Sequence, residues 1–273
     1  GGRMRALLAG QGALPGLLYR HLDLTDCAPL VVELDGFPSQ LTDEDPIRFR
    51  IEHLGSLLRD LHRLGVREIC LAGHVARPKL DPAAVDGPTK TYVARIAAAI
   101  QQGDDGALRE ILAIIEEFGI TVIGAHQLMP ELLPTSGVLT REKLPPQARA
   151  DATRGAEVVS ALSAADLGQS CVISHGQVLA VEALGGTDWM LGTLGGGARA
   201  NGKSGGVLFK APKTGQDLRA DMPAIGPHTI AGAARAGLDG IVIQAGGVMV
   251  LDLPETLKAA HDAGLFLWVR DAH

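Results

Sequence analysis

Cysteine, aromatic residues and excess positive charge are all scarce in this chain of 273 residues. Its three cysteines, Cys27, Cys70 and Cys171, are far apart and form no CxxC pair, which argues against a disulfide scaffold or a zinc ribbon. Aromatic residues make up 3%, and 31 acidic against 25 basic residues give a formal net charge of −6. A general nucleic-acid binder needs a basic surface and stacking platforms, so we expect no nucleic-acid partner.

Long apolar runs are also missing from the sequence. No uninterrupted run reaches the roughly 18 residues that a membrane-spanning helix needs. The first residues lack the basic-then-apolar order of a secretory signal. Together with the scattered cysteines, which suit a reducing compartment, these features predict a cytoplasmic protein.

Apolar residues and glycine, by contrast, are abundant. Hydrophobic residues make up 46% of the chain, enough for real cores, and 35 residues are glycine. The glycines follow no collagen-like period, so we expect them in turns and in loops that approach a ligand or another backbone closely. The length is comfortable for two domains.

Strand-like and helix-like segments alternate along the first half, which predicts parallel strand pairing in an α/β sheet. Four prolines between residues 129 and 146 interrupt this rhythm. We predict a Rossmann-like parallel domain over 4–130, a linker over 131–146, and a catalytic α/β domain with a mixed sheet over 147–273, with a ligand cleft between the domains. The expected strands are 5–9, 30–34, 68–72, 121–124, 170–174, 177–182, 207–210, 240–244, 248–251 and 265–269. The main expected helices are 52–64, 90–102, 107–118, 148–165, 228–236 and 254–262, besides one through 19–21.

Two stretches match catalytic motifs in their letters only. Residues 197–204 fit the phosphate-loop pattern GxxxxGK[ST], and 202–206 fit the nucleophile pattern GxSxG. Both motifs need a strand before the loop and a helix after it, whereas here a glycine-rich run precedes and the strand expected at 207–210 comes next. We interpret 192–206 as a glycine-rich loop. A phosphate-loop ATPase or kinase is kept as an alternative hypothesis for the function.

The turn after the first expected strand starts like a dinucleotide-binding fingerprint. Gly10 and Gly12 fit its first two glycines, but Pro15 occupies the third position. Such a turn can present backbone amides to an anion, or it can be no more than a tight strand-to-helix connection, and both interpretations stay open. Farther along, Asp104 and Asp105 are expected to cap the helix over 107–118 rather than to bind a metal.

Charged residues are concentrated between 207 and 226. A strand delivers Lys210 to its end, and the bends at Pro212 and Gly215 are expected to bring Lys213, Asp217, Arg219 and Asp221 into a small volume. Cationic side chains suit phosphate oxygens, and carboxylates suit Mg²⁺ or Mn²⁺, so the loop holds the groups needed for hydrolysis at phosphorus. The alternative is a solvated turn of compensating charges.

A hairpin is expected from the strands over 170–174 and 177–182. After it, Thr187 and Asp188 come behind a glycine pair and can cap a helix beginning near Trp189. The functional interpretation gives Thr187 a phosphate or sugar contact and Asp188 a metal or base role. For Asp188, capping is the favoured interpretation.

Short motifs along nearly the whole chain, specific in their order and spacing, give it a family resemblance. The chain resembles the UDP-2,3-diacylglucosamine pyrophosphatases of lipid A biosynthesis, of the type without a metallophosphoesterase motif. The motifs lie at 8–15, 72–78, 103–105, 124–126, 166–169, 178–183, 186–188, 210–213, 221–223 and Gly226.

The resemblance implies that water cleaves UDP-2,3-diacylglucosamine to UMP and 2,3-diacylglucosamine 1-phosphate (lipid X), by attack at the sugar-side phosphorus with Mg²⁺ or Mn²⁺. It also implies a lipid substrate and product, and transient contact with the inner face of the inner membrane. No basic amphipathic helix identifies the docking surface. A homo-oligomer is possible. A non-catalytic nucleotide-sugar or lipid-binding protein on the same fold is the alternative.

The residues that the resemblance selects extend the charge argument. The family's essential aspartate falls on Asp221, which we expect to hold the metal or orient the attacking water, with Asp188 as a second metal ligand. Lys210 and Lys213 are expected to neutralise phosphate. The remaining substrate-binding candidates are Gly10, Gly12, Ala13, His74, Gln169, Thr187 and Pro212.

Overall fold

The computed structural model of the chain divides into two compact units. It describes residues 4–41, 45–102, 104–141, 143–195, 199 and 202–272, and of residues 104 and 105 only the backbone. Unit 1 comprises Gly1–Met129 together with Asp217–Asp221, and unit 2 comprises Pro130–Gln216 and Met222–His273. The chain therefore passes from one unit to the other three times.

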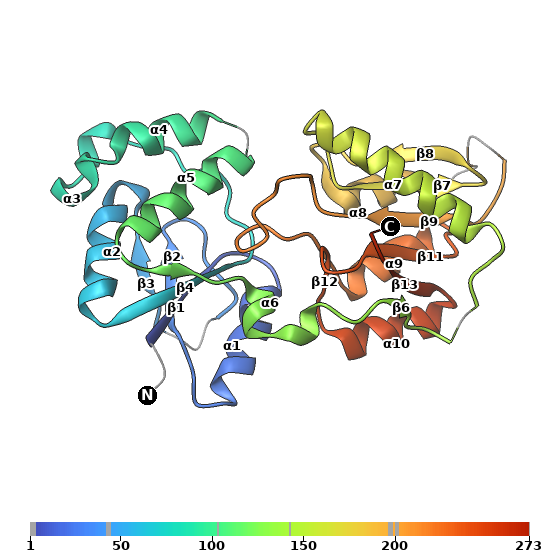
Figure 1. The fold of residues 1–273 in the computed structure, drawn as a ribbon, viewed down its shortest axis with the longest axis horizontal. Coiled ribbons are helices and arrows are strands. Elements are labelled where there is room, and N and C mark those ends of the chain that lie inside the picture. The colour runs from blue at the N-terminus through green and yellow to red at the C-terminus, as the bar shows by residue number, and fades with distance from the viewer. Residues whose placement is uncertain are drawn as a thin grey trace. The chain divides into compact units, whose positions relative to one another are not determined.

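Unit 1, as far as it is described, is built on a five-stranded parallel sheet in the order β3-β2-β1-β4-β5 (Figure 1). Its strands are β1 (Met4–Ala9), β2 (Leu30–Leu34), β3 (Ile47–Phe49), β4 (Val66–Ala72) and β5 (Thr121–Val122). The direction of strand order reverses between β1 and β4, as it does in doubly wound nucleotide-binding folds. The prediction of a Rossmann-like parallel domain is confirmed.

Six helices of unit 1 accompany this sheet in the described residues, and the longer ones bury apolar faces. They are α1 (Leu14–Asp23), α2 (Leu54–Arg63), α3 (Gly87–Lys90), α4 (Val93–Gln101), α5 (Asp104–Glu117) and α6 (Ala125–Leu128), with short 3₁₀ turns at Ile51–His53 and Pro82–Ala84. In α2, Leu54, Leu57, Leu58 and Leu61 recur at helical spacing and are buried. With residues of α4 and α5 they form one core on one face of the sheet, while α1 packs on β1 and α6.

Unit 2 contains a mixed sheet in the order β6-β13-β11-β9-β7-β8 among its described residues. Strands β9, β11 and β13 are parallel, and β6, β7 and β8 run antiparallel to their neighbours. The strands are β6 (Gly137–Val138), β7 (Ser170–Ser174), β8 (Gln177–Val181), β9 (Val207–Lys210), β11 (Gly240–Gln244) and β13 (Phe266–Arg270); β10 (Ala224–Ile225) and β12 (Met249–Val250) form a separate pair. The predicted mixed sheet is confirmed.

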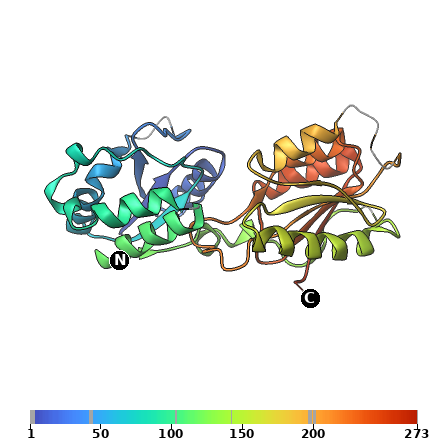
Figure 2. The same cartoon turned by 90° about the horizontal axis from the view of Figure 1, so that it is seen from above.

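Helices cover both faces of the unit 2 sheet (Figure 2). The helix α7 (Ala148–Ala164) packs on one face against Phe209 and Phe266, and α8 (Gly186–Leu194), α9 (Pro227–Arg235) and α10 (Leu253–Ala263) lie on the other. Small residues permit the close packing of α7, because a Cβ on Gly155 would lie 2.6 Å from the Cβ of Phe209.

Three local expectations differ from the structure. The segment 131–146, predicted as a linker, contains the 3₁₀ turn Pro130–Leu132 and β6, which pairs with β13. The helix expected near Trp189 begins at Gly186, and its N-cap Gly185 has no side-chain cap. The expected cap of the helix over 107–118 involves Asp104 and Asp105, whose side chains lie outside the described part, and that helix begins at Asp104.

The phosphate-loop stretch 197–204 falls partly outside the described residues, at 197, 198, 200 and 201. The next element in the chain is β9, a strand and not the helix that a phosphate loop requires. This context favours the rejection of that motif.

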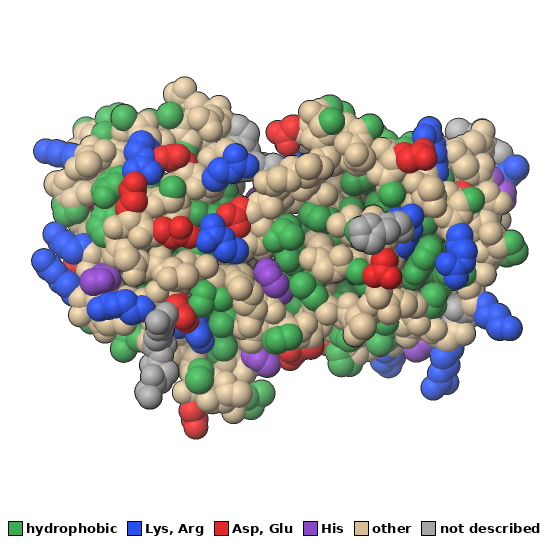
Figure 3. All heavy atoms as spheres, viewed as in Figure 1, with side chains coloured by type: hydrophobic (Ala, Val, Ile, Leu, Met, Phe, Trp, Pro, Cys, Tyr) green, Lys and Arg blue, Asp and Glu red, His purple; other side chains and the backbone are tan. Residues whose placement is uncertain are grey.

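Acidic and basic side chains are interspersed on the face of the molecule drawn in Figure 3. None of the helices in the described stretches is both long and apolar enough to cross a bilayer.

Candidate active site

The carboxyl ends of β1 and β4 meet where the strand order of unit 1 reverses, which is where open α/β sheets bind ligands. Gly10 and Gln11 come directly after β1, and Gly73 and His74 directly after β4. A short antiparallel bridge joins the two turns: the Gln11 N–H donates to the His74 carbonyl at 2.8 Å, and the His74 N–H donates to the Gln11 carbonyl at 2.9 Å. The bridge places His74 beside the glycine turn.

Glycine is required in these turns for two reasons. A Cβ on Gly10 would lie 2.6 Å from the His74 carbonyl oxygen, so the two turns can pack only without a side chain there. Gly12 has φ +101°, a left-handed conformation that favours glycine, and a Cβ on it would meet no atom within 4 Å. The backbone at Gly12 therefore faces open space.

The helix α1 starts directly after this turn. Its N-cap, Ala13, offers no side-chain cap, and Pro15 occupies the first turn. Backbone amides at such an uncapped start can bind an anion or water. Gly10, Gly12, Ala13 and His74 thus lie together at one edge of the sheet, and their contact with substrate stays a prediction.

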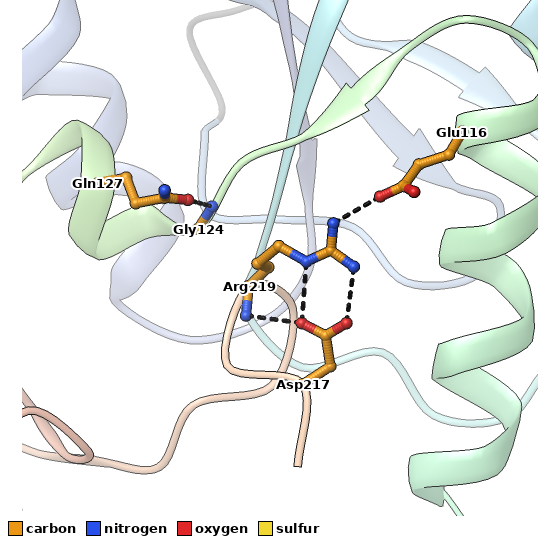
Figure 4. A network of polar contacts seen from close by, with 5 residues as sticks. All are labelled: Glu116, Gly124, Gln127, Asp217 and Arg219. Atoms are coloured by element: carbon orange, nitrogen blue, oxygen red, sulfur yellow. Dashed lines mark hydrogen bonds and ion pairs between the residues drawn. The ribbon is translucent and has the colours of Figure 1, made fainter. Parts of the chain in front are cut away.

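The segment 217–221 comes from the second half of the chain but belongs to unit 1. Arg219 holds it there: its guanidinium donates to Glu116 of α5 at 2.5 Å, and to both carboxylate oxygens of Asp217 at 3.1 and 2.8 Å (Figure 4). The backbone of Arg219 passes close to Gly124, and a Cβ added to Gly124 would lie 3.3 Å from the Arg219 Cα. Gly124 in turn donates its N–H to the Gln127 side chain at 2.8 Å.

The paired charges of this segment affect its chemistry. The hydrogen bond from Arg219 lowers the pKa of the Asp217 carboxyl, and that same contact raises the pKa of the guanidinium. The two charges compensate each other, and a contact of Arg219 with phosphate or of Asp217 with a metal stays a prediction. Asp221 ends the segment half-buried, and its N–H donates to the Asp217 carbonyl at 3.1 Å.

In unit 2, Lys210 ends β9 directly opposite Ser170 of the antiparallel β7. The side chain is buried, and its Nζ donates to the Thr187 hydroxyl at 3.1 Å and to the Ala224 carbonyl at 3.0 Å. Burial lowers the pKa of Lys210, while the charges of Glu182 and Asp188 act in the other direction. These two contacts use two of the three ammonium hydrogens.

Glu182, the residue after β8, organises the groups around Lys210. Its Oε1 accepts from the Gln169 N–H at 3.1 Å, and its Oε2 accepts from the Ser170 hydroxyl at 2.8 Å and from the Thr187 hydroxyl. The sequence did not single out Glu182 or Ser170. The sequence feature that could have identified Glu182 is its position at the end of an expected strand and five residues before Thr187.

The residues after β9 fold back on the start of β7. The Ala211 N–H donates to the Gln169 carbonyl at 3.0 Å, and the Gln169 side chain donates to Gln216 at 3.0 Å. Pro212 packs closely against Gly247, because a Cβ added to Gly247 would lie 2.7 Å from the proline ring. The Lys213 Nζ donates to Asp166 at 2.9 Å.

The predicted single cluster of charges stays a prediction, because its members belong to both units. The loop divides: Lys213 pairs with Asp166 of unit 2, whereas Asp217 and Arg219 pair with each other on unit 1. Asp221 belongs to unit 1 and Lys210 to unit 2, so their meeting at a diphosphate stays a prediction.

Asp188 lies in the first turn of α8, not at its cap. Its carboxylate is 3.4 Å from the His228 Nε2, and both side chains are exposed. A carboxylate in this position is favoured by the partial positive charge of the helix start. Thr187, beside it, points its hydroxyl into the buried cluster of Lys210 and Glu182.

Single carboxylates of the candidate residues suit a cation that also binds phosphate oxygens. Among the residues that the structure describes, no three His, Cys, Asp or Glu side chains form a group that could hold a metal alone. Mg²⁺ is commonly bound by one or two carboxylates together with substrate phosphate oxygens. Asp221 of unit 1 and Asp188 of unit 2 are each a single carboxylate donor of that kind, and metal binding by either stays a prediction.

Comparison with known proteins supports the resemblance found in the sequence. The model of the LpxI N-terminal domain matches residues 4–132, and that of the LpxI C-terminal domain matches residues 135–268. A Caulobacter vibrioides protein named UDP-2,3-diacylglucosamine pyrophosphatase LpxI is 37% identical over 270 residues, covering 97% of this chain and 96% of the relative. The two domain models match in order and together account for most of the sequence, so the chain belongs to the LpxI family.

Proposed function

We propose that this protein hydrolyses the pyrophosphate bond of UDP-2,3-diacylglucosamine, giving UMP and 2,3-diacylglucosamine 1-phosphate. The observation that carries the proposal is the 37% identity, over almost the full length of both chains, to the relative named for this activity. A lipid A biosynthetic role is the biological consequence of that activity.

Lys210 supplies positive charge to the diphosphate in this proposal. Its third ammonium hydrogen is not used by the two contacts that hold it, and a buried cation acts on phosphate oxygens with little screening by water. Lys213 adds a second charge by exchanging its contact with Asp166 for one with phosphate. Gln169 and Pro212 shape the loop that carries Lys213.

Asp221 acts on the attacking water. The water oxygen bonds to the sugar-side phosphorus, the bridging P–O bond breaks, and its electron pair leaves with UMP. Asp221 either orients that water and accepts its proton, or provides an oxygen ligand to the cation. The glycine turn at Gly10, Gly12 and Ala13, with His74, contributes backbone and ring contacts to the substrate.

The cofactor in this proposal is Mg²⁺ or Mn²⁺, held by Asp221, with Asp188 as the second candidate ligand. When bound, it supplies positive charge that stabilises the transition state at phosphorus.

The protein acts in the cytoplasm at the inner face of the inner membrane, where a substrate with two acyl chains resides. Contact with that surface is transient in this proposal, and self-association is compatible with it. The competing function is a binding protein for nucleotide sugars or lipids that uses the same contacts without turnover.

Incubation of the purified protein with UDP-2,3-diacylglucosamine, with and without EDTA, tests the activity directly. We expect release of UMP that EDTA abolishes and added Mg²⁺ or Mn²⁺ restores. In ¹⁸O-labelled water, the label should enter the lipid phosphate and not UMP. Binding of the lipid without release of UMP at any metal concentration would favour the non-catalytic alternative.

A further inference from the structure

The Glu182 carboxylate accepts three hydrogen bonds and has no cation in direct contact among the described residues. Its donors are the Gln169 N–H, the Ser170 hydroxyl and the Thr187 hydroxyl. Ser170 is fully buried and Thr187 is 9% exposed. The Glu182 carboxylate therefore links Gln169, Ser170 and Thr187 through hydrogen bonds to one negative charge.

The charge of Glu182 sets the direction of the hydrogen bonds around it. The Thr187 hydroxyl lies near the Ser170 hydroxyl, at 3.2 Å, and in closer contact with the Glu182 carboxylate. Because an ionised carboxylate can only accept, the single proton of Thr187 points toward Glu182. The lone pairs of that hydroxyl then face the other way. They accept from the Lys210 Nζ at 3.1 Å.

Lys210 is held by this chain of hydrogen bonds and by one backbone group. The Ala224 carbonyl accepts from the Nζ at 3.0 Å, and the Thr187 oxygen accepts the second hydrogen. Two fixed acceptors determine where the third hydrogen points, so the direction of the ammonium depends on the proton position of Thr187, and hence on the charge of Glu182.

We propose that Glu182, acting through the Thr187 hydroxyl, is a positioning residue that orients the Lys210 ammonium toward the substrate diphosphate. This inference rests on the proposed function, because it assigns a purpose to the orientation of Lys210. Glu182 itself does not touch the substrate.

The negative charge of Glu182 also helps Lys210 to stay protonated in a buried position. Burial lowers the pKa of the Lys210 ammonium, and the nearby charges that act against this shift are those of Glu182 and Asp188. Removal of the Glu182 charge therefore disturbs both the direction and the protonation of the ammonium. A small displacement of a charged group from its productive geometry can lower a rate by about 10²-fold.

The Glu182→Gln variant tests the proposal with little change of shape. Its amide can donate as well as accept, so the Thr187 proton is no longer fixed toward residue 182. We expect kcat to fall about 10²-fold with a KM within about threefold of wild type. Glu157→Gln is the matched control, because Glu157 is exposed and pairs with Arg154 on the surface of α7. It should keep wild-type kcat.

A second pair of variants separates positioning from folding. Thr187→Ser keeps the hydroxyl and should retain kcat within about fivefold, whereas the isosteric Thr187→Val removes the link and should lose about as much as Glu182→Gln. Circular dichroism and thermal melting identify variants that fail to fold. Wild-type kcat in folded Glu182→Gln or in folded Thr187→Val would overturn the proposal.

An NMR titration keeps this inference separate from the proposed function. In protein labelled with ¹⁵N-lysine, the Lys210 Nζ signal is assigned by its loss in Lys210→Arg and followed against pH. Glu182→Gln should move its titration to lower pH, and Glu157→Gln should not. If the wild type releases no UMP, the proposed function fails, while this titration still decides whether Glu182 controls Lys210; an unchanged titration overturns the inference.

Discussion

At the scale of single residues, Lys210 is under two opposing demands. Its burial brings an unscreened charge to the site, and the same burial disfavours that charge. Thr187 and the Ala224 carbonyl compensate in part by accepting two of its hydrogens. A lysine in this setting is suited to a ligand that completes its coordination with negative oxygen atoms.

The pH dependence of activity should reflect this lysine. Because burial lowers the pKa of Lys210 below its ordinary value of 10.5, kcat/KM should fall as pH rises through the lowered pKa. Stability should respond with the opposite sign. The folded state binds the proton less tightly than the unfolded chain, so this residue's contribution to stability improves as pH rises from the lowered pKa toward 10.5.

Profiles of kcat/KM against pH for wild type and Lys210→Arg would check this prediction. A guanidinium stays charged over the whole range, so the alkaline decrease should disappear in the variant even if its rate is lower. The same alkaline decrease in both proteins would assign it to another group.

Asp221 should be necessary for turnover and dispensable for the fold. Asp221→Asn removes the negative charge with little change in size, and we expect kcat to fall by about 10³-fold or more, since both of its possible roles need a carboxylate. Binding of the lipid, measured by calorimetry, should persist. Asp217→Asn is a useful comparison, because Asp217 forms an ion pair with Arg219. Unchanged turnover in Asp221→Asn would remove Asp221 from the mechanism.

Which charged residues make up the candidate site could be predicted from the sequence only in part. The density of charge after β9 pointed to Lys210 and Lys213 and, with the resemblance, to Asp221. The pairing of Arg219 with Glu116, 103 residues earlier, could not be predicted, because it depends on a tertiary contact and not on local spacing. Glu182 was missed for the same reason: its donors come from a strand pair and from the next helix.

At the scale of elements, the turn that joins β1 to α1 is shaped by its close approach to β4. Gly10 and Gly12 stand two residues apart but carry different constraints. The former has backbone atoms of His74 against it, and the latter has a positive φ and open space.

Substitution by alanine should separate these two constraints. Gly10→Ala forces the backbone at His74 to move. We expect it to lower the free energy of unfolding by about 3 kcal/mol or more, in the upper range for overpacking. Gly12→Ala meets no atom and should cost about 1–2 kcal/mol, the strain of a left-handed alanine. Urea unfolding of both variants gives the comparison. Equal losses would mean that the backbone at His74 moves away from an added methyl group at lower cost than we expect.

Most elements could be predicted from the spacing of their apolar residues. The exceptions are short or depend on partners. The three-residue β3 and the two-residue β6 have no periodic signal and exist because β2 and β13 offer a free edge. The early start of α8 at Gly186 is explained by the burial of Thr187 in the Lys210 cluster, a contact that capping rules do not include.

At the scale of the whole molecule, the segment 217–221 is the part of the second half that is built into unit 1. Its side-chain contacts with α5 are surface-exposed, and such ion pairs contribute little to global stability. We expect their effect to be local, in keeping the segment that ends at Asp221 in place.

Two adjacent glutamates of α5 offer a matched test of this local role. Glu116→Gln weakens the contact to Arg219, whereas Glu117→Gln weakens a contact to Arg95 of α4. We expect the first variant to be cleaved by trypsin after Lys213 or Arg219 up to about fivefold faster and to lose kcat/KM, with a melting temperature near that of wild type. The second variant should match wild type in both assays. Equal cleavage rates in the two variants would show that Arg219 does not hold the segment.

The three passages of the chain between the units constrain how the two halves could have been assembled in evolution. Where a single linker connects two domains, recombination within that linker can exchange either domain. Here a gene encoding only residues 1–129 would lack five residues of its own unit, and among them Asp221. A new partner fused to either half would have to reproduce that inserted piece, so the pair is expected to be inherited as one indivisible gene.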